Sequence, residues 1–132
     1  DRIDTDLAAA IDYMRQELAI DEVFLVGASM GGTAALVAAA RVDVAGVVSI
    51  SSPGQFPPLD ATETVADVAE PKLFITAEDD VPAFRSQAEF WELAVEPKEQ
   101  YVYKGNAHGT AIFDTADGPD LERRIIAFLT SN

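Results

Sequence analysis

Three side chains in this sequence have the chemical types that together cleave acyl bonds, and they occur in the order serine, acid, histidine. Ser29 lies in the segment GASMG, the acidic run EDD consists of Glu78, Asp79 and Asp80, and His108 is the only histidine. A serine hydroxyl becomes a nucleophile when a histidine removes its proton, and a carboxylate orients that histidine. These residues therefore predict nucleophilic catalysis if the fold brings them together.

The segment around Ser29 has the pattern Gly-x-Ser-x-Gly, formed with Gly27 and Gly31. The apolar residues 23–26 before it are typical of a buried strand, and the alanine-rich residues 34–40 after it are typical of a helix. A serine in a sharp turn from strand to helix projects from the sheet, and small neighbours let the backbone close there. The alternatives are a tight turn with an incidental serine and an anion-binding helix start.

His108 lies in the segment KGNAHG, directly after a predicted strand. At that position it could serve as the base for a serine at the end of a neighbouring strand. The acid is less well defined, because Glu78, Asp79 and Asp80 are consecutive. The residues by themselves leave open which of these carboxylates orients the histidine.

A run of carboxylates also has two interpretations that do not involve the histidine. Such a run is most often solvated on the surface. It could instead bind a metal ion together with Asp114 and Asp117. We favour neither interpretation here, and the sequence predicts no metal and no cofactor.

The elements that must position these residues alternate between strands and helices. Apolar runs predict strands at residues 22–26, 44–50, 72–76 and 100–103. Helical spacing and end signals predict helices at residues 3–18, 30–41, 82–95 and 119–129, with a short helix at 64–69 and a proline-rich loop at 51–60.

This alternation predicts an α/β fold, a three-layer sandwich whose mainly parallel sheet of about four strands has helices on both faces. The strand at 22–26 is apolar throughout, which predicts burial on both of its faces. Parallel sheets bind ligands at the carboxyl ends of their strands. Ser29 follows the first predicted strand, Asp79 and Asp80 follow the third, and His108 follows the fourth, so we expect these side chains at that edge.

Composition excludes several classes of function. The 132 residues include 23 Asp and Glu against 9 Lys and Arg, and the net charge of −14 makes nucleic acid and anionic membranes unsuitable partners. No apolar run reaches the roughly 20 residues of a membrane span. The absence of cysteine excludes a thiolate nucleophile. The acidic surface indicates either high solubility or adaptation to high salt.

Three segments resemble the C-terminal part of the α/β-hydrolase superfamily, which includes serine esterases and lipases. They are LVGASMGG, KLFITAEDDVP and YKGNAHG, and the resemblance covers nearly the whole chain. It implies that Ser29 is the nucleophile, His108 the general base and Asp80 the acid, with Asp79 as the alternative acid. It also implies that the backbone N–H of Met30 stabilises the oxyanion.

The chain departs from this family in one respect: a single predicted helix precedes the strand at 22–26, where the family has several strands. The resemblance therefore implies one domain, residues 1–132, that lacks the family's N-terminal strands and the second oxyanion donor. It is either a fragment of a larger hydrolase, which we favour, or a pared-down relative of the family. We expect the missing segment or another chain to lie against residues 22–26.

The implied function is hydrolysis of carboxylic esters or related small acyl compounds through an acyl-enzyme. The alternative is a non-catalytic domain of the same fold that binds a ligand or partner in the same crevice. A phosphate-binding loop at Gly31 and Gly32 is a weaker alternative, because it lacks the basic residue that such loops carry.

Overall fold

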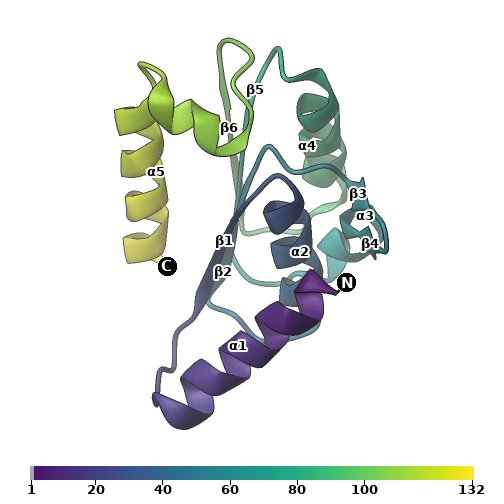
Figure 1. Ribbon diagram of the computed structural model, residues 1–132, viewed down its shortest axis with the longest axis vertical. Helices are drawn as coiled ribbons and strands as arrows, with labels where there is room; N and C mark the ends of the chain where they lie inside the picture. The colour runs from purple at the N-terminus through teal and green to yellow at the C-terminus, as the bar shows by residue number, and fades with distance from the viewer. Residues whose placement is uncertain (1) are drawn as a thin grey trace.

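The computed structural model describes residues 2–132, which form four parallel strands in one sheet (Figure 1). The strand order is β1-β2-β5-β6. Their bounds are Phe24–Ala28 for β1, Gly46–Ile50 for β2, Lys72–Ala77 for β5 and Lys98–Tyr103 for β6. All three pairings are parallel, so every carboxyl end lies at the same edge. The predicted parallel sheet of about four strands is confirmed.

Helices cover both faces of this sheet (Figure 1). One face carries α1 (Ile3–Glu17), α2 (Met30–Ala39) and α4 (Val81–Leu93), and the other carries α5 (Gly118–Ser131). The predicted three-layer α/β architecture is therefore confirmed. Within residues 2–132, none of the helices combines the length and the apolar character needed to cross a membrane.

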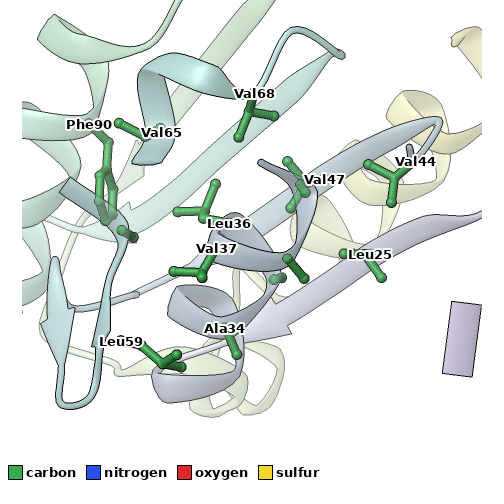
Figure 2. Close-up of a cluster of buried hydrophobic side chains, with 14 of the residues drawn as sticks. Leu25, Ala34, Leu36, Val37, Val44, Val47, Leu59, Val65, Val68 and Phe90 are labelled. Atoms are coloured by element: carbon green, nitrogen blue, oxygen red, sulfur yellow. The ribbon is translucent and has the colours of Figure 1, made fainter. Parts of the chain in front are cut away.

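The larger core is built around α2. All of its residues from Gly32 to Ala39 are buried, and Leu36 and Val37 lie at the centre of the cluster, with Phe90 of α4 at its far side (Figure 2). Alanine side chains let α2 pack closely against β1 and β2, where long side chains would hold it away. The chain must therefore turn within one residue, since β1 ends at Ala28 and α2 begins at Met30.

The first strand differs from its prediction in position and in burial. It starts at Phe24 and continues to Ala28, and it is an edge strand of the sheet. Leu25 is buried on the α2 side, but Val26 on the other face is 50% exposed. The smaller core under α5 is formed mainly by residues of β2 and β5, with Phe24 at its margin. The expectation of burial on both faces was wrong because α5 does not extend over Val26.

The segment between β2 and β5 is more ordered than predicted. Gln55–Phe56 (β3) and Leu59–Asp60 (β4) form a small antiparallel hairpin with Pro57 and Pro58 at its tip. The short helix follows at once as Ala61–Thr64 (α3) and Val65–Asp67 (η1). It begins before the predicted residue 64, because Asp60 accepts hydrogen bonds from the backbone N–H groups of Thr62 and Glu63 and caps it.

Two ionic clusters hold α1 and α5 in place. Asp4 of α1 is 2% exposed and accepts hydrogen bonds from Arg2, at 2.8 Å, and from Arg41 just after α2. The hydrogen bond from Arg2 holds the pKa of the Asp4 carboxyl below its usual value. On the opposite face, the Tyr103 hydroxyl donates to Asp120 of α5 at 2.7 Å, and burial raises the pKa of Tyr103. The first cluster joins α1 to the segment after α2, and the second joins α5 to β6.

The outer edge of β1 carries unpaired backbone groups, because no strand within residues 2–132 pairs with it. Exposed edges of this kind favour pairing with another strand. We propose that a further strand, from a longer form of the chain or from another chain, pairs with this edge.

This proposal predicts that the chain associates through β1 as its concentration rises. Val26→Lys should shift the size-exclusion profile toward the monomer, because a charge on an edge strand blocks pairing. Val102→Lys is the matched control, since Val102 is 36% exposed on β6 at the opposite edge. Equal effects of both variants, or a monomer at all concentrations, would contradict pairing of this edge with another chain and leave a strand from a longer form of the chain.

Candidate active site

Ser29 is the single residue between β1 and α2, and its backbone is strained. Its φ and ψ are 53° and −127°, in a region that residues with a Cβ rarely adopt. The position is held because the Ser29 N–H donates to the carbonyl of Ile50 at 2.8 Å. Strain of this kind persists where the surrounding structure fixes it, and it is concentrated at functional sites. The turn presents the hydroxyl at the carboxyl edge of the sheet.

The three residues predicted from the sequence lie in direct contact. Nε2 of His108 is 2.9 Å from the Ser29 hydroxyl, and Nδ1 is 2.6 Å from a carboxylate oxygen of Asp80. An ionised carboxylate only accepts hydrogen bonds, so Nδ1 carries the proton of a neutral ring. Nε2 is then free to accept the proton of the serine hydroxyl.

The same three residues are the N-cap residues of three helical segments: Ser29 of α2, Asp80 of α4 and His108 of η2 (Gly109–Asp114). Serine and aspartate at this position normally accept a hydrogen bond from the first turn of the helix. None of the three side chains does so here. Their polar groups contact one another instead.

Of the three consecutive acidic residues, Asp80 is the one in contact with the histidine. Its side chain is only 12% exposed, whereas Glu78 and Asp79 are exposed. The backbone of Asp79 has a different role, since its N–H donates to the carbonyl of Gly105 at 2.9 Å and joins the acid turn to the histidine loop. The geometry therefore favours Asp80 over Asp79 as the orienting acid.

The carboxylates do not form a metal site in the structure. Among residues 2–132, no group of three or more His, Cys, Asp or Glu side chains is placed to hold a metal ion. The alternative that joined the run Glu78, Asp79 and Asp80 to Asp114 and Asp117 is therefore not supported.

Met30 is the first residue of α2, and its backbone N–H has no carbonyl partner within the helix. The positive end of the helix dipole adds to this N–H, so the position suits a developing negative charge. The Met30 side chain is exposed and contributes to a cavity of about 590 Å³. The other residues lining this cavity are Ile3, Asp6, Phe56, Pro57, Pro58 and Leu59.

Sequence reasoning missed this cavity. Its walls come from the start of α1 and from the β3–β4 hairpin, which are far apart in the chain. Only their tertiary packing brings them beside Met30, and no local pattern in the sequence indicates it.

The glycines around Ser29 differ from one another in their surroundings. A Cβ at Gly27 would overlap the carbonyl of Gly31, as the pattern Gly-x-Ser-x-Gly predicts. A Cβ at Gly31 would meet nothing within 4 Å, whereas one at Gly32 would overlap the hydroxyl of Ser52. The close approach therefore falls on Gly27 and Gly32, and the expectation that Gly31 must be small for steric reasons was wrong.

The sequence model that describes the alpha/beta hydrolase fold matches residues 2–104 of this chain. The chain therefore belongs to the α/β-hydrolase family. The matched range includes Ser29 and Asp80 and ends before His108, so the contact of that histidine with both residues is an independent geometric observation.

Solved structures share the fold. The chain is similar to a monoacylglycerol lipase of Paleococcus ferrophilus, with 19% identity, 97% of this chain and 75% of that chain covered, and a TM-score of 0.80. It is also similar to an esterase of Pyrococcus furiosus (16% identity, 99% and 62% covered, TM-score 0.81). A third similar structure is a dienelactone hydrolase of Anabaena variabilis (24% identity, 94% and 56% covered, TM-score 0.78).

The chain spans less than two thirds of the length of the last two structures. At sequence identities this low, the structural similarity shows a common fold and nothing more. A search among curated proteins found no match.

The glycine geometry predicts opposite outcomes for two adjacent substitutions. Gly32→Ala should lower the free energy of unfolding by about 1–3 kcal/mol, because the added methyl group overlaps Ser52. Gly31→Ala should raise it by up to about 1 kcal/mol, because alanine is the better helix former and the space is open. Urea unfolding followed by circular dichroism measures both. Equal effects of the two variants would contradict the assignment of the close approach to Gly32 and of the open space to Gly31.

Proposed function

We propose that this chain is a serine hydrolase that cleaves carboxylic esters through an acyl-enzyme formed on Ser29. The observation that carries the proposal is the continuous hydrogen-bonded series from the Ser29 hydroxyl through both ring nitrogens of His108 to Asp80, with separations of 2.9 and 2.6 Å. Membership of the α/β-hydrolase family supports it. The solved structures that share the fold include a lipase and an esterase, which is consistent with the proposal.

In the acylation step, the Ser29 oxygen attacks the ester carbonyl while Nε2 of His108 takes the hydroxyl proton. Asp80 holds the ring in place and stabilises its positive charge. The N–H of Met30 donates to the oxyanion as the carbonyl oxygen becomes negative. His108 then gives the proton to the leaving alcohol, and the acyl group remains on Ser29.

In the deacylation step, water enters from the solvent and repeats the sequence. His108 takes a proton from the water, the resulting hydroxide attacks the acyl carbonyl, and Ser29 leaves with the proton returned by the histidine. The His108 side chain is 51% exposed, so water and a small ester have access to it.

Substitution of the three residues tests this mechanism. Ser29→Ala and His108→Ala should each lower kcat for p-nitrophenyl acetate by at least about 10⁴-fold, because such residues act as a unit. Asp80→Asn should lose about 10²- to 10⁴-fold, because the amide favours the wrong tautomer of the ring. Asp79→Asn is the control and should change the rate by less than about threefold, because its carboxylate does not contact the histidine.

Labelling with a fluorophosphonate distinguishes this proposal from its main alternative. Covalent modification of Ser29 that requires His108 supports the hydrolase. A folded chain that does not react with the probe and hydrolyses no ester would favour the non-catalytic, ligand-binding alternative.

We further propose that the apolar part of the substrate occupies the cavity beside Met30. Its lining is apolar except for the carboxylate of Asp6. The net charge of −14 adds a negative potential around the whole chain. A neutral acyl or alkyl group fits this environment, whereas a carboxylate on the substrate would be repelled by Asp6.

This cavity predicts a preference between two esters of similar size. The chain should hydrolyse p-nitrophenyl butyrate with a higher kcat/KM than p-nitrophenyl hemisuccinate. Asp6→Asn should lower the ratio of these two kcat/KM values by about 3- to 10-fold, as expected for the loss of one nearby charge in a solvated site. Asp12→Asn, at an exposed position of α1 that does not line the cavity, is the control. An unchanged ratio in Asp6→Asn would place the substrate elsewhere.

A further inference from the structure

A second strained serine lies at the end of the neighbouring strand. Ser51 follows β2 directly, has a φ of 51° and is 1% exposed. Its N–H donates to the carbonyl of Ile75 at 2.8 Å, as the N–H of Ser29 does to Ile50. A residue with a side chain at positive φ, fully buried and beside the active site, is the kind of outlier that indicates a function.

The Ser51 side chain contacts the loop that carries His108. Its hydroxyl oxygen accepts a hydrogen bond of 2.9 Å from the backbone N–H of Gly109. Gly109 is itself buried, has a φ of 60° and directly follows the histidine. The nearby Ser49 and Ser52 hydroxyls bond to each other at 2.7 Å and do not contact this loop.

Two hydrogen bonds from other parts of the chain hold the backbone of the histidine loop. Before the histidine, the carbonyl of Gly105 accepts a hydrogen bond from the N–H of Asp79. After the histidine, the N–H of Gly109 donates a hydrogen bond to the Ser51 hydroxyl. The first bond ties the loop to the turn that bears Asp80. The second bond ties the loop to the end of β2, the strand between β1 and β5. The N–H of Ser29 is bonded to the same strand.

We infer that Ser51 is a positioning residue for His108, an inference that rests on the proposed hydrolase function. Without the Ser51 hydroxyl, the buried N–H of Gly109 loses its hydrogen-bond acceptor. Because an unpaired buried N–H is costly, the backbone at Gly109 must move until this N–H reaches another acceptor. His108 is the adjacent residue, so the ring moves relative to Ser29 and Asp80. Ser51 acts only through this backbone and does not contact the reacting atoms.

Nitrogen NMR of the histidine ring tests the inference without relying on activity. The chain contains one histidine, so [15N]histidine labelling reports on His108 alone. At mildly alkaline pH the wild type should show one protonated and one unprotonated ring nitrogen. In Ser51→Ala the two signals should converge toward the average of exchanging tautomers. Ser49→Ala removes another buried hydroxyl from the same region and should leave the spectrum unchanged.

Ser51→Gly separates the hydroxyl from the backbone strain. Glycine adopts positive φ readily, so this variant keeps the turn while lacking the hydroxyl. It should show the same convergence as Ser51→Ala. Fluorophosphonate labelling of Ser29 should be about 10- to 100-fold slower in both variants and unchanged in Ser49→Ala, as expected when a catalytic group is displaced by a fraction of an ångström to an ångström.

The outcomes separate the two proposals. Wild-type ring signals in Ser51→Gly, in a folded chain, would overturn the positioning role whether or not the chain is active. A wild-type chain that does not label would refute the proposed hydrolase function, and the ring spectra would still decide whether Ser51 orders His108.

Discussion

The arrangement of the site depends on a parallel hydrogen-bond ladder that continues beyond the ends of the strands. Bonds of 2.8 Å run from the N–H of Ser29 to Ile50, from Ser51 to Ile75 and from Glu78 to Tyr103. Each loop therefore starts at a point fixed by the next strand along the sheet. The Ser29 turn is bonded to β2, β2 pairs with β5, and β5 pairs with β6, so the loops that carry Ser29, Asp80 and His108 share one rigid frame.

This frame carries a cost in stability, because the three helical segments that begin at Ser29, Asp80 and His108 have no side-chain cap. A serine or aspartate cap normally contributes about 1 kcal/mol. Here the side chains of Ser29, Asp80 and His108 form hydrogen bonds with one another and not with the first turns of their helices. The almost completely buried α2 offsets this loss, since it packs against both β1 and β2. The missing caps lower stability at the carboxyl edge of the sheet, and the packing of α2 in the larger core compensates for this loss.

Much of the fold was predictable because local patterns and the ladder agree. The apolar run before Ser29 and the alanines after it predicted a strand, a turn and a helix, and the fold confirms all three. The cap at Asp60 was also visible in principle, since Glu63 stands three residues later in a capping pattern. The order serine, acid, histidine identified the residues that the structure brings into contact.

The remaining features could not be predicted because they depend on which strands and helices meet. The exposure of Val26 follows from the position of β1 at the edge and from the limited reach of α5. The need for glycine at position 32 follows from Ser52, which comes from the loop after a different strand. The hydrogen bond of Ser51 to Gly109 joins residues that are distant in the chain. None of these contacts has a local pattern in the sequence.

The β3–β4 hairpin has an evolutionary consequence. Its two short strands pair only with each other, so the register of the main sheet does not depend on them. Insertions or deletions at the tip, around Pro57 and Pro58, can therefore accumulate without disturbing the ladder. Because the same tip forms a wall of the cavity beside Met30, such length changes would alter the shape of that cavity while Ser29 and its partners stay in place. Under the proposed function, the range of substrates can therefore diverge among related chains through this one segment.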